Sequence, residues 1–281
     1  MESLGISENF IEANTDALVV VVFKNEKAAS GALKELDKLT GGHIAAAIKS
    51  EEFKGETGET VMFRLTPKGK MKAGRLLPAG AGDKADHKGH SVAAAAGTAT
   101  RHLRKCNVKS FAFMPRFDGN ASDAAQHSVQ GAITSQFELD KYKTKDKNDK
   151  AVSKIVVFVE GAKPGELKEG LTRGHAIGDS MNFTRDLANE PPNILTPTEM
   201  ANRAAKMAKE LGLKCEILDE ARMKKLGMGS LLSVSIGSEQ PAKLIVLRYT
   251  PSKSTAKKNE LLALVGKGIT FDTGGISLKP G

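Results

Sequence analysis

The feature that most constrains this fold is a repeated alternation of short apolar runs with segments of helical periodicity. The first run, ALVVVVF at 17–23, predicts a strand buried on both faces of a sheet. Further strands are predicted at 60–65, 75–79, 109–114 and 154–160. Helices are predicted at 29–39, 91–105 and 121–137. Strands separated by helices form right-handed β-α-β units, so the pattern predicts an α/β fold with a mostly parallel sheet.

The second part of the chain repeats this alternation. A long helix is predicted at 166–187, and we expect it to pack under the sheet of the second domain. The prolines of NEPPN at 189–193 end that helix. Thr196, Pro197 and Glu199 then supply the N-cap, first position and capping box of a new helix, which ends at Gly212. Strands follow at 214–218 and 244–249, and we expect both to neighbour a strand at 261–265.

A polar run at 141–150 lies between these two regions. It is the densest run of charge in the chain, but it mixes both signs, as a solvated linker does. We therefore predict an N-terminal α/β domain over 1–150 and a second α/β domain over 151–281.

Composition indicates a soluble globular chain without a membrane partner. The 281 residues are 40% hydrophobic, which is enough for a core. No apolar run approaches the roughly 18 residues that span a bilayer. The start, MESLGISENF, lacks a basic and an apolar signal region, so we expect a cytoplasmic protein. Cys106 and Cys215 lie far apart in sequence and are expected to be reduced, buried thiols.

The net charge of +9, from 42 basic and 33 acidic residues, permits contact with nucleic acid. Aromatic platforms for base stacking are scarce, because the chain has no Trp and two Tyr. Nucleic acid therefore stays a possible partner that composition does not support.

The last residues, LLALVGKGITFDTGGISLKPG at 261–281, carry the strongest chemical pattern. If 261–265 is a strand of a parallel sheet, Lys267, Asp272 and Lys279 follow its carboxyl end, where α/β folds bind ligands. A phosphate loop fails on spacing, since Gly268 and not Ser or Thr follows the lysine. A deprotonated lysine amine can instead ligate a metal, with Asp272 as the accompanying oxygen ligand.

The segment VGKGITFDTGGISLKP resembles the metal-binding signature of the leucyl aminopeptidase (cytosol aminopeptidase) family, with Thr273 where the usual form has serine. The stretches at 182–201, 218–238 and 241–249 resemble that family in the same order. The resemblance implies an N-terminal α/β (macro-like) domain, followed by the first part of an α/β dinuclear-zinc exopeptidase domain with a mostly parallel sheet.

By this resemblance, Lys267 and Asp272 are ligands of a centre of two divalent metal ions, zinc or manganese, and Asp272 bridges both. Lys279 is then a catalytic lysine. The implied activity is release of leucine-like N-terminal residues from peptide substrates, by a protein that assembles as a homo-oligomer, a hexamer. A nucleic-acid-binding member and a non-catalytic structural member of the family are the alternatives.

The family's site also contains two further aspartates, a glutamate and an arginine, which would follow residue 281. We therefore expect this chain to be the N-terminal portion of the enzyme and to be inactive alone.

Several other patterns are expected to be structural. The letters NTDA at 14–17 match the start of another family motif, but Leu18 follows where that motif has glutamate, so we expect ordinary turn residues. Gly80-Ala81-Gly82 is a weak match to a dinucleotide fingerprint. The histidines at 87, 90 and 102 are expected at the surface. The run LGMGS at 226–230 is either an apolar binding lip or a helix C-cap at Gly227.

Overall fold

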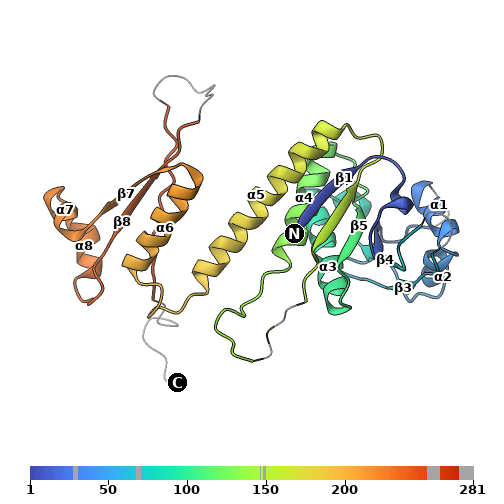
Figure 1. Cartoon of the computed structure of the whole chain (residues 1–281), viewed down its shortest axis with the longest axis horizontal. Helices are drawn as coiled ribbons and strands as arrows, with labels where there is room; N and C mark the ends of the chain where they lie inside the picture. The colour runs from blue at the N-terminus through green and yellow to red at the C-terminus, as the bar shows by residue number, and fades with distance from the viewer. Residues whose placement is uncertain (28–30, 68–70, 146, 148–149, 252–259, 272–281) are drawn as a thin grey trace. The chain divides into compact units, whose positions relative to one another are not determined.

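In a computed structural model, the chain is described at residues 1–27, 31–67, 71–145, 147, 150–251 and 260–271. It divides into two compact units, Met1–Asp186 and Leu187–Gly281 (Figure 1). Each unit has a sheet of its own.

The first unit contains a six-stranded sheet. Its strands are β1 (Glu2–Ile6), β2 (Ala17–Val22), β3 (Phe63–Arg64), β4 (Arg75–Gly80), β5 (Ser110–Met114) and β6 (Lys154–Phe158). Their order in the sheet is β1-β6-β5-β2-β4-β3, and every neighbouring pair is parallel except β3 and β4. The expected α/β class with a mostly parallel sheet is confirmed.

Helices connect these strands, and one more helix, α5, follows the last strand, β6. They are α1 (Gly31–Leu39), α2 (His43–Lys49), α3 (Gly89–Lys105), α4 (Ala121–Thr134) and α5 (Pro164–Ala188), with short 3₁₀ turns η1 (Phe10–Glu12) and η2 (Lys84–Asp86). The sequence pattern did not predict β1 or α2. Strand β1 has alternating exposed and partly buried residues and no continuous apolar run, so it lacks the signal that revealed β2.

Strand β2 explains why helices cover both faces of the sheet. All of its residues are buried, and successive side chains point to opposite faces. Val19 and Val21 pack in one core with residues of α3 and α4, whereas Val20 and Val22 pack in a second core with residues of α1 and α2. The sheet therefore lies between two layers of helices (Figure 1).

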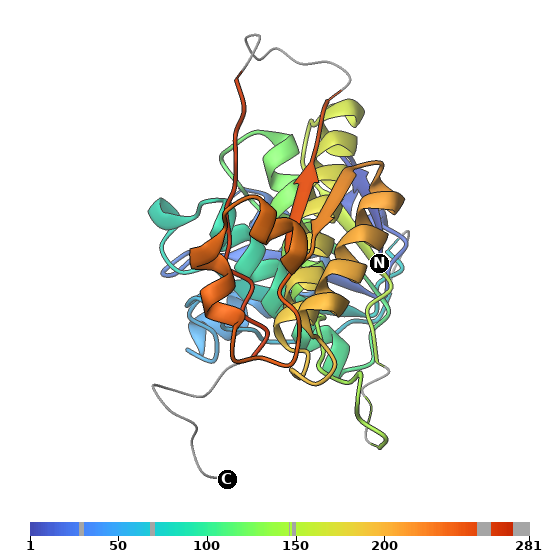
Figure 2. The same ribbon diagram turned by 90° about the vertical axis from the view of Figure 1, so that its left-hand side faces the viewer.

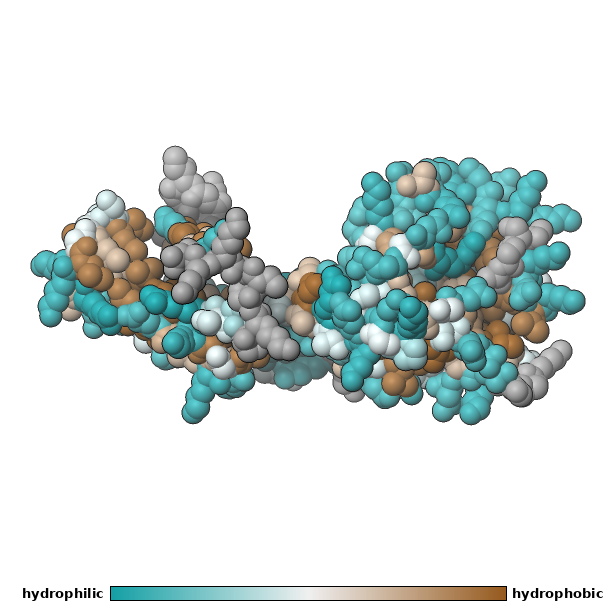
Figure 3. Space-filling model, turned by 90° about the horizontal axis from the view of Figure 1, so that it is seen from above, coloured by the Kyte–Doolittle hydropathy of each residue, from teal (hydrophilic) through white to brown (hydrophobic). Residues whose placement is uncertain are grey.

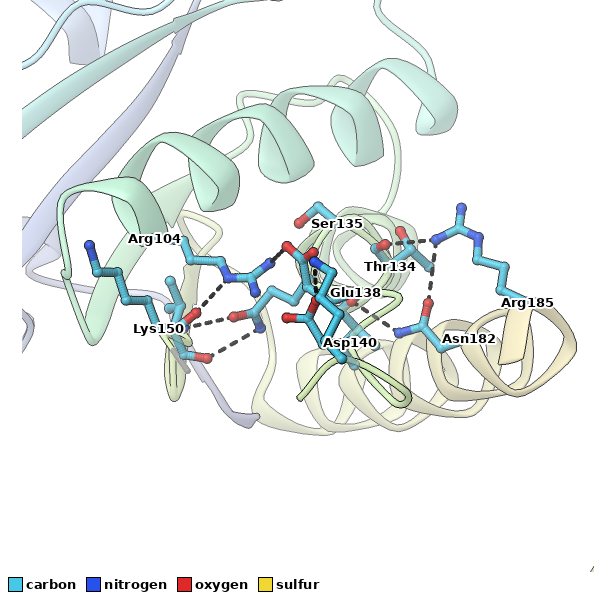
Figure 4. Close-up of polar contacts among 12 residues, drawn as sticks. Arg104, Thr134, Ser135, Glu138, Asp140, Lys150, Asn182 and Arg185 are labelled. Atoms are coloured by element: carbon cyan, nitrogen blue, oxygen red, sulfur yellow. Dashed lines mark hydrogen bonds and ion pairs between the residues drawn. The ribbon is translucent and has the colours of Figure 1, made fainter. Parts of the chain in front are cut away.

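Helix α5 packs in the first unit, on α4. Gly170, Gly174 and Gly178 face α4, and a β-carbon on Gly174 would lie 2.6 Å from the backbone oxygen of Gln126. Arg185, labelled in Figure 4, donates to a carbonyl of the last turn of α4 at 2.7 Å. The glycine face of α5 thus matches the backbone of α4. The expectation that this helix packs under the sheet of the second domain stays a prediction.

The polar run before β6 is fastened to the first unit. Arg104 of α3 donates from Nε to the backbone oxygen of Lys150 and from Nη1 to Glu138, both at 2.5 Å (Figure 4). The side-chain amide of Gln136 accepts from the Val152 N–H at 2.7 Å and donates to its carbonyl at 3.2 Å. These bonds hold residues 150 and 152 in place directly before β6, where the chain re-enters the sheet.

The compact units thus divide at 186/187, later than the domain boundary expected at residue 150. Strand β6 and helix α5, which we placed in the second domain, complete the sheet and the helical layer of the first unit.

The second unit contains α6 (Pro197–Leu211), β7 (Lys214–Leu218), α7 (Glu220–Lys225), α8 (Gly229–Ser235) and β8 (Leu244–Arg248). Strands β7 and β8 form an antiparallel pair, and α6 packs on both, as Figure 2 shows. The predicted limits of α6 are confirmed: Thr196 Oγ1 accepts from the Glu199 N–H, Pro197 opens the helix and Gly212 follows it with φ +68°. Gly227 lies one residue beyond Leu226, the C-cap of α7, and has φ +74°, the left-handed conformation that commonly ends a helix.

The expected strand at 261–265 is not formed. These residues have no regular structure, and Leu261, Leu264 and Val265 are 89%, 91% and 97% exposed. An apolar run becomes a buried strand only if a neighbour supplies backbone hydrogen bonds, and no described strand pairs with this run.

Candidate functional site

The structure places only one of the three predicted site residues. Lys267 lies in the irregular segment 260–271 and is exposed. Its backbone carbonyl accepts from the Ile269 N–H at 3.2 Å. Asp272 and Lys279 lie outside the described residues. The proposed roles of these three side chains therefore remain predictions from the sequence.

The described part of the chain also assembles no metal centre. It contains no group of three or more His, Cys, Asp or Glu side chains that could hold a metal ion. Of the predicted site residues, the structure describes Lys267 alone, and a single lysine cannot hold two ions. The described residues therefore do not by themselves form a dinuclear centre.

A partly buried ion-pair network lies at the start of the second unit. Arg203 of α6 donates to Glu190 at 2.7 Å and to Glu199 at 2.8 Å. The hydrogen bond with Glu199 is the largest cause that raises the pKa of Arg203, and Glu190 contributes in the same direction. The same bond lowers the pKa of Glu199. The network fastens the proline-containing turn at 189–193 to α6.

The NTDA segment is structural, as expected. Thr15 Oγ1 donates to the backbone oxygen of Ala17 at 3.1 Å. Asp16 Oδ2 accepts from the N–H and the hydroxyl of Ser110 at 2.9 and 2.8 Å. These bonds join the start of β2 to the start of β5, so Asp16 is used as a strand connector.

The glycines at 80–82 form a turn after β4, and Gly82 has φ +72°. A cleft of about 330 Å³ lies between this turn and the first turns of α3, and Asp83 and Asp86 are among its lining residues. Acidic side chains at this position oppose the phosphates of a dinucleotide. The weak fingerprint is thus a strand-end turn.

The three histidines do not all lie at the surface. His90 is exposed, and His102 is partly buried with its Nδ1 2.9 Å from Thr60 Oγ1. His87 is buried, so its expected surface position was wrong: its Nε2 lies 2.9 Å from the Pro115 carbonyl, and its ring packs edge-on against Phe23. The thiols of the two cysteines are free but only partly buried.

A pocket that the sequence did not reveal lies at the carboxyl ends of three parallel strands. Phe23 follows β2, the residues from Met114 to Asp118 end and follow β5, and Phe158 to Glu160 end and follow β6. Its volume is about 250 Å³. The sequence did not predict this pocket, because its lining residues come from loops that are far apart in sequence. The one available signal was that each of these loops follows the carboxyl end of a predicted strand.

Arg116 forms the most constrained part of this pocket. Its guanidinium donates to Glu26 Oε2 at 2.6 Å and Oε1 at 2.5 Å, and to the Val21 carbonyl at 2.9 Å. It also lies over the ring of Phe23, 5.0 Å from the centroid. Its backbone has φ +48°, which is uncommon for a residue other than glycine and is found mostly where function or packing imposes it.

The Arg116 pair also changes the ionisation of Glu26. Burial raises the pKa of this carboxyl. The hydrogen bonds from Arg116 and from the Phe23 N–H lower the pKa, and their combined effect outweighs that of burial, so the net shift is downward. The pair is therefore ionised at neutral pH and holds the ends of β2 and β5 together.

No described helix is long and apolar enough to cross a membrane.

Two domains of one protein family match the chain, in the same order along the sequence. The N-terminal domain of the cytosol aminopeptidase family matches residues 19–146, and its catalytic domain matches residues 182–281. The chain belongs to the cytosol aminopeptidase family. The resemblance read from its C-terminal motif is thereby confirmed.

Curated relatives of this family match nearly the whole chain. A probable cytosol aminopeptidase of Solibacter usitatus is 40% identical over 269 residues, which are 96% of this chain and 52% of the relative. A cytosol aminopeptidase of Pseudomonas aeruginosa is 36% identical over 272 residues, 95% of this chain and 54% of the relative. The chain thus spans about half the length of these family members.

Solved structures support the fold. A mutant of tomato leucine aminopeptidase superposes with a TM-score of 0.78 at 23% identity, covering 90% of this chain and 52% of that one. The bottromycin maturation enzyme BotP in complex with Mn gives 0.64 at 22% identity, covering 85% and 46%. At these identities the likeness concerns the fold alone.

Proposed function

We propose that this chain is the N-terminal portion of a metal-dependent aminopeptidase that releases leucine-like N-terminal residues from peptides. The observation that carries the proposal is the catalytic-domain match at 182–281, which contains the motif VGKGITFDTGGISLKP. The names of the curated relatives, cytosol aminopeptidases, support the activity. The manganese complex of BotP supports a divalent metal.

Three residues have distinct roles in this proposal. Lys267 and Asp272 bind metal, with Asp272 bridging two ions, and Lys279 contacts the substrate. Two divalent ions, zinc or manganese, would supply an activated water and polarise the peptide carbonyl. The Lys279 ammonium stabilises the negative charge that grows on the carbonyl oxygen, more in the transition state than in the ground state. Lys267 has the opposite requirement, because an amine binds metal only without its proton.

Hydrolysis of a leucyl amide tests the proposal. A full-length protein that continues from residue 281 through the remaining family ligands should release leucine, and a chelator should abolish the release. A polypeptide of residues 1–281 should have negligible activity, because two metal-binding side chains cannot hold two ions in catalytic geometry. Chelator-resistant hydrolysis, or none in the full-length protein with metal added, would overturn the proposed function.

The partners and location are parts of the same proposal. Peptides are the substrates, and a hexamer is the assembly. The cytoplasm is the compartment, and the names of the relatives, cytosol aminopeptidases, support this location. Sedimentation of the full-length protein tests the hexamer directly. Salt-dependent retardation of a DNA duplex would instead favour the nucleic-acid-binding alternative.

A further inference from the structure

The pocket lined by Phe23, Arg116 and Glu160 lies at the topological switch point of the first sheet. From β2 the chain goes on to β4 on one side, whereas from β5 it goes on to β6 on the other side. Strands β2 and β5 are neighbours. Crevices at the carboxyl ends of such strands are where open α/β sheets bind ligands.

Arg116 presents donors for a carboxylate in this pocket. Its bonds to Glu26 and to the Val21 carbonyl use both hydrogens of Nη1 and one of Nη2. The Nε–H and the second Nη2–H have no partner among the described residues. Together they form a fork that matches a carboxylate in two parallel hydrogen bonds, and Glu26 holds the guanidinium in position for it.

A negative side chain in the same pocket complements that fork. Glu160 follows β6 and has no hydrogen-bond or ion-pair partner among the described residues. The other charges of the lining are already paired, since Lys84 lies 3.5 Å from Asp118. The pocket therefore offers one site for a carboxylate and one for an ammonium.

The remaining walls are apolar and the space is small. Rings of Phe23, Phe117 and Phe158 line the pocket together with Met114. Its volume of about 250 Å³ lies below the range of roughly 300–1,000 Å³ that holds drug-sized ligands. A molecule that uses all of these groups carries an ammonium, a carboxylate and an apolar group, and it must be small.

We propose that this pocket binds a free α-amino acid with an apolar side chain, such as leucine, with its carboxylate on Arg116 and its ammonium on Glu160. This ligand belongs to the product class of the proposed peptidase, and that link rests on the proposed function. The binding itself does not, because the pocket is complete within residues 1–186.

Titration calorimetry of the 281-residue chain with L-leucine, in the presence of a chelator, tests the proposal. The chelator excludes leucine binding to a metal. Leucine should bind saturably with a Kd in the micromolar to millimolar range, and the Met114 methyl resonance should shift during the titration. Leucinamide, which lacks the carboxylate, and 4-methylpentanoate, which lacks the ammonium, should each bind at least about tenfold more weakly.

Two variants and a matched control assign the contacts. Arg116→Lys keeps the charge but loses the fork, so its Kd should rise about tenfold. Glu160→Gln should raise the Kd severalfold and leaves the fold intact, because Glu160 is exposed. Glu52→Gln makes the same exchange at an exposed glutamate outside the pocket and should bind leucine normally.

Four results would overturn the proposal: no saturable binding, equal binding of leucine and leucinamide, equal binding of leucine and a leucyl-leucine dipeptide, or equal weakening by Glu52→Gln and Glu160→Gln. A full-length protein without peptidase activity would leave leucine binding unchanged. Absent leucine binding would likewise leave the peptidase proposal standing, so the two failures are distinguishable.

Discussion

The two units of this protein bury their strands to different degrees. In the first unit, β2 has hydrogen-bonded neighbours on both sides and its residues are fully buried. In the second unit, β7 and β8 pair only with each other among the described strands, and Leu247 of β8 is 42% exposed. Figure 3 shows hydrophobic residues on the surface of this second unit, at the left of the view. Two strands alone are marginally stable in water, so the stability of this pair depends on the helices that pack against it, α6 above all.

The largest expected effect comes from truncating a side chain in the first core. Phe113→Ala should lower the free energy of unfolding by about 3–5 kcal/mol, because Phe113 is fully buried in the core beneath α3 and α4. Leu247→Ala should cost less than about 1 kcal/mol, since much of that side chain is already exposed. Urea unfolding followed by circular dichroism measures both. Equal losses would break the contrast between the units.

The α4–α5 contact should show the next largest effect. Gly170→Val should lower stability by about 1–3 kcal/mol, because a side chain there meets the backbone of Ser122. Gly165→Ala is the control in the same helix, since no atom lies within 4 Å of a β-carbon at that position. Thermal unfolding should separate the two variants. If Gly165→Ala destabilised the protein as much as Gly170→Val, close packing on α4 would not explain the glycines.

Helix caps in the second unit should each contribute about 1 kcal/mol. Thr196→Ala removes the acceptor of the Glu199 N–H, and Asp219→Ala removes the acceptor of the Arg222 N–H. Hydrogen exchange should quicken in α6 for the first variant and in α7 for the second. Thr196→Ser, which keeps the hydroxyl, should exchange at the original rate. Unchanged exchange in Thr196→Ala would show that packing on β7 and β8 alone maintains α6.

The smallest effect concerns pH and sharpens the account of the first core. Burial lowers the pKa of His87 below 6.5, against the hydrogen bond to the Pro115 carbonyl, which raises it. The unfolded chain therefore binds the proton more readily, so stability is complete above about pH 6.5 and falls as the pH drops below that value. His102 and His127 are shifted in the same direction by burial.

A pair of variants isolates the contribution of His87. His87→Gln should flatten the loss of stability between pH 6.5 and the lower folded-state pKa, whereas His90→Gln, at an exposed histidine, should not. Urea midpoints across this range measure the difference. An identical pH dependence in both variants would rule out the buried imidazole as a source.

The sequence predicted best where a local signal and the tertiary environment agree. The all-apolar run of β2 and the cap residues Thr196 and Gly212 mark elements that the structure contains. The run at 261–265 has the same composition as a buried strand, but a strand also needs a partner edge, which composition does not specify. The hydrogen bonds of Arg104 to Lys150 and Glu138 could not be predicted either, because they join α3 to a polar run that is far away in sequence.

The candidate sites differ in the same way. Lys267, Asp272 and Lys279 stand within one short motif, so the sequence alone was enough to propose them. The pocket at Arg116 requires residues from the ends of β2, β5 and β6, and only the order of strands in the sheet brings these ends together.

Metal content of three variants of the full-length protein tests the central proposal most directly. Asp272→Ala should lose both ions, because a bridging carboxylate holds both, and Lys267→Ala should weaken one ion more than the other. Lys279→Ala should keep its metal while kcat falls by about 10²- to 10³-fold, as for loss of a transition-state donor. Mass spectrometry of the purified proteins gives the metal count. A fully loaded Asp272→Ala and a metal-free Lys279→Ala would contradict the assigned roles.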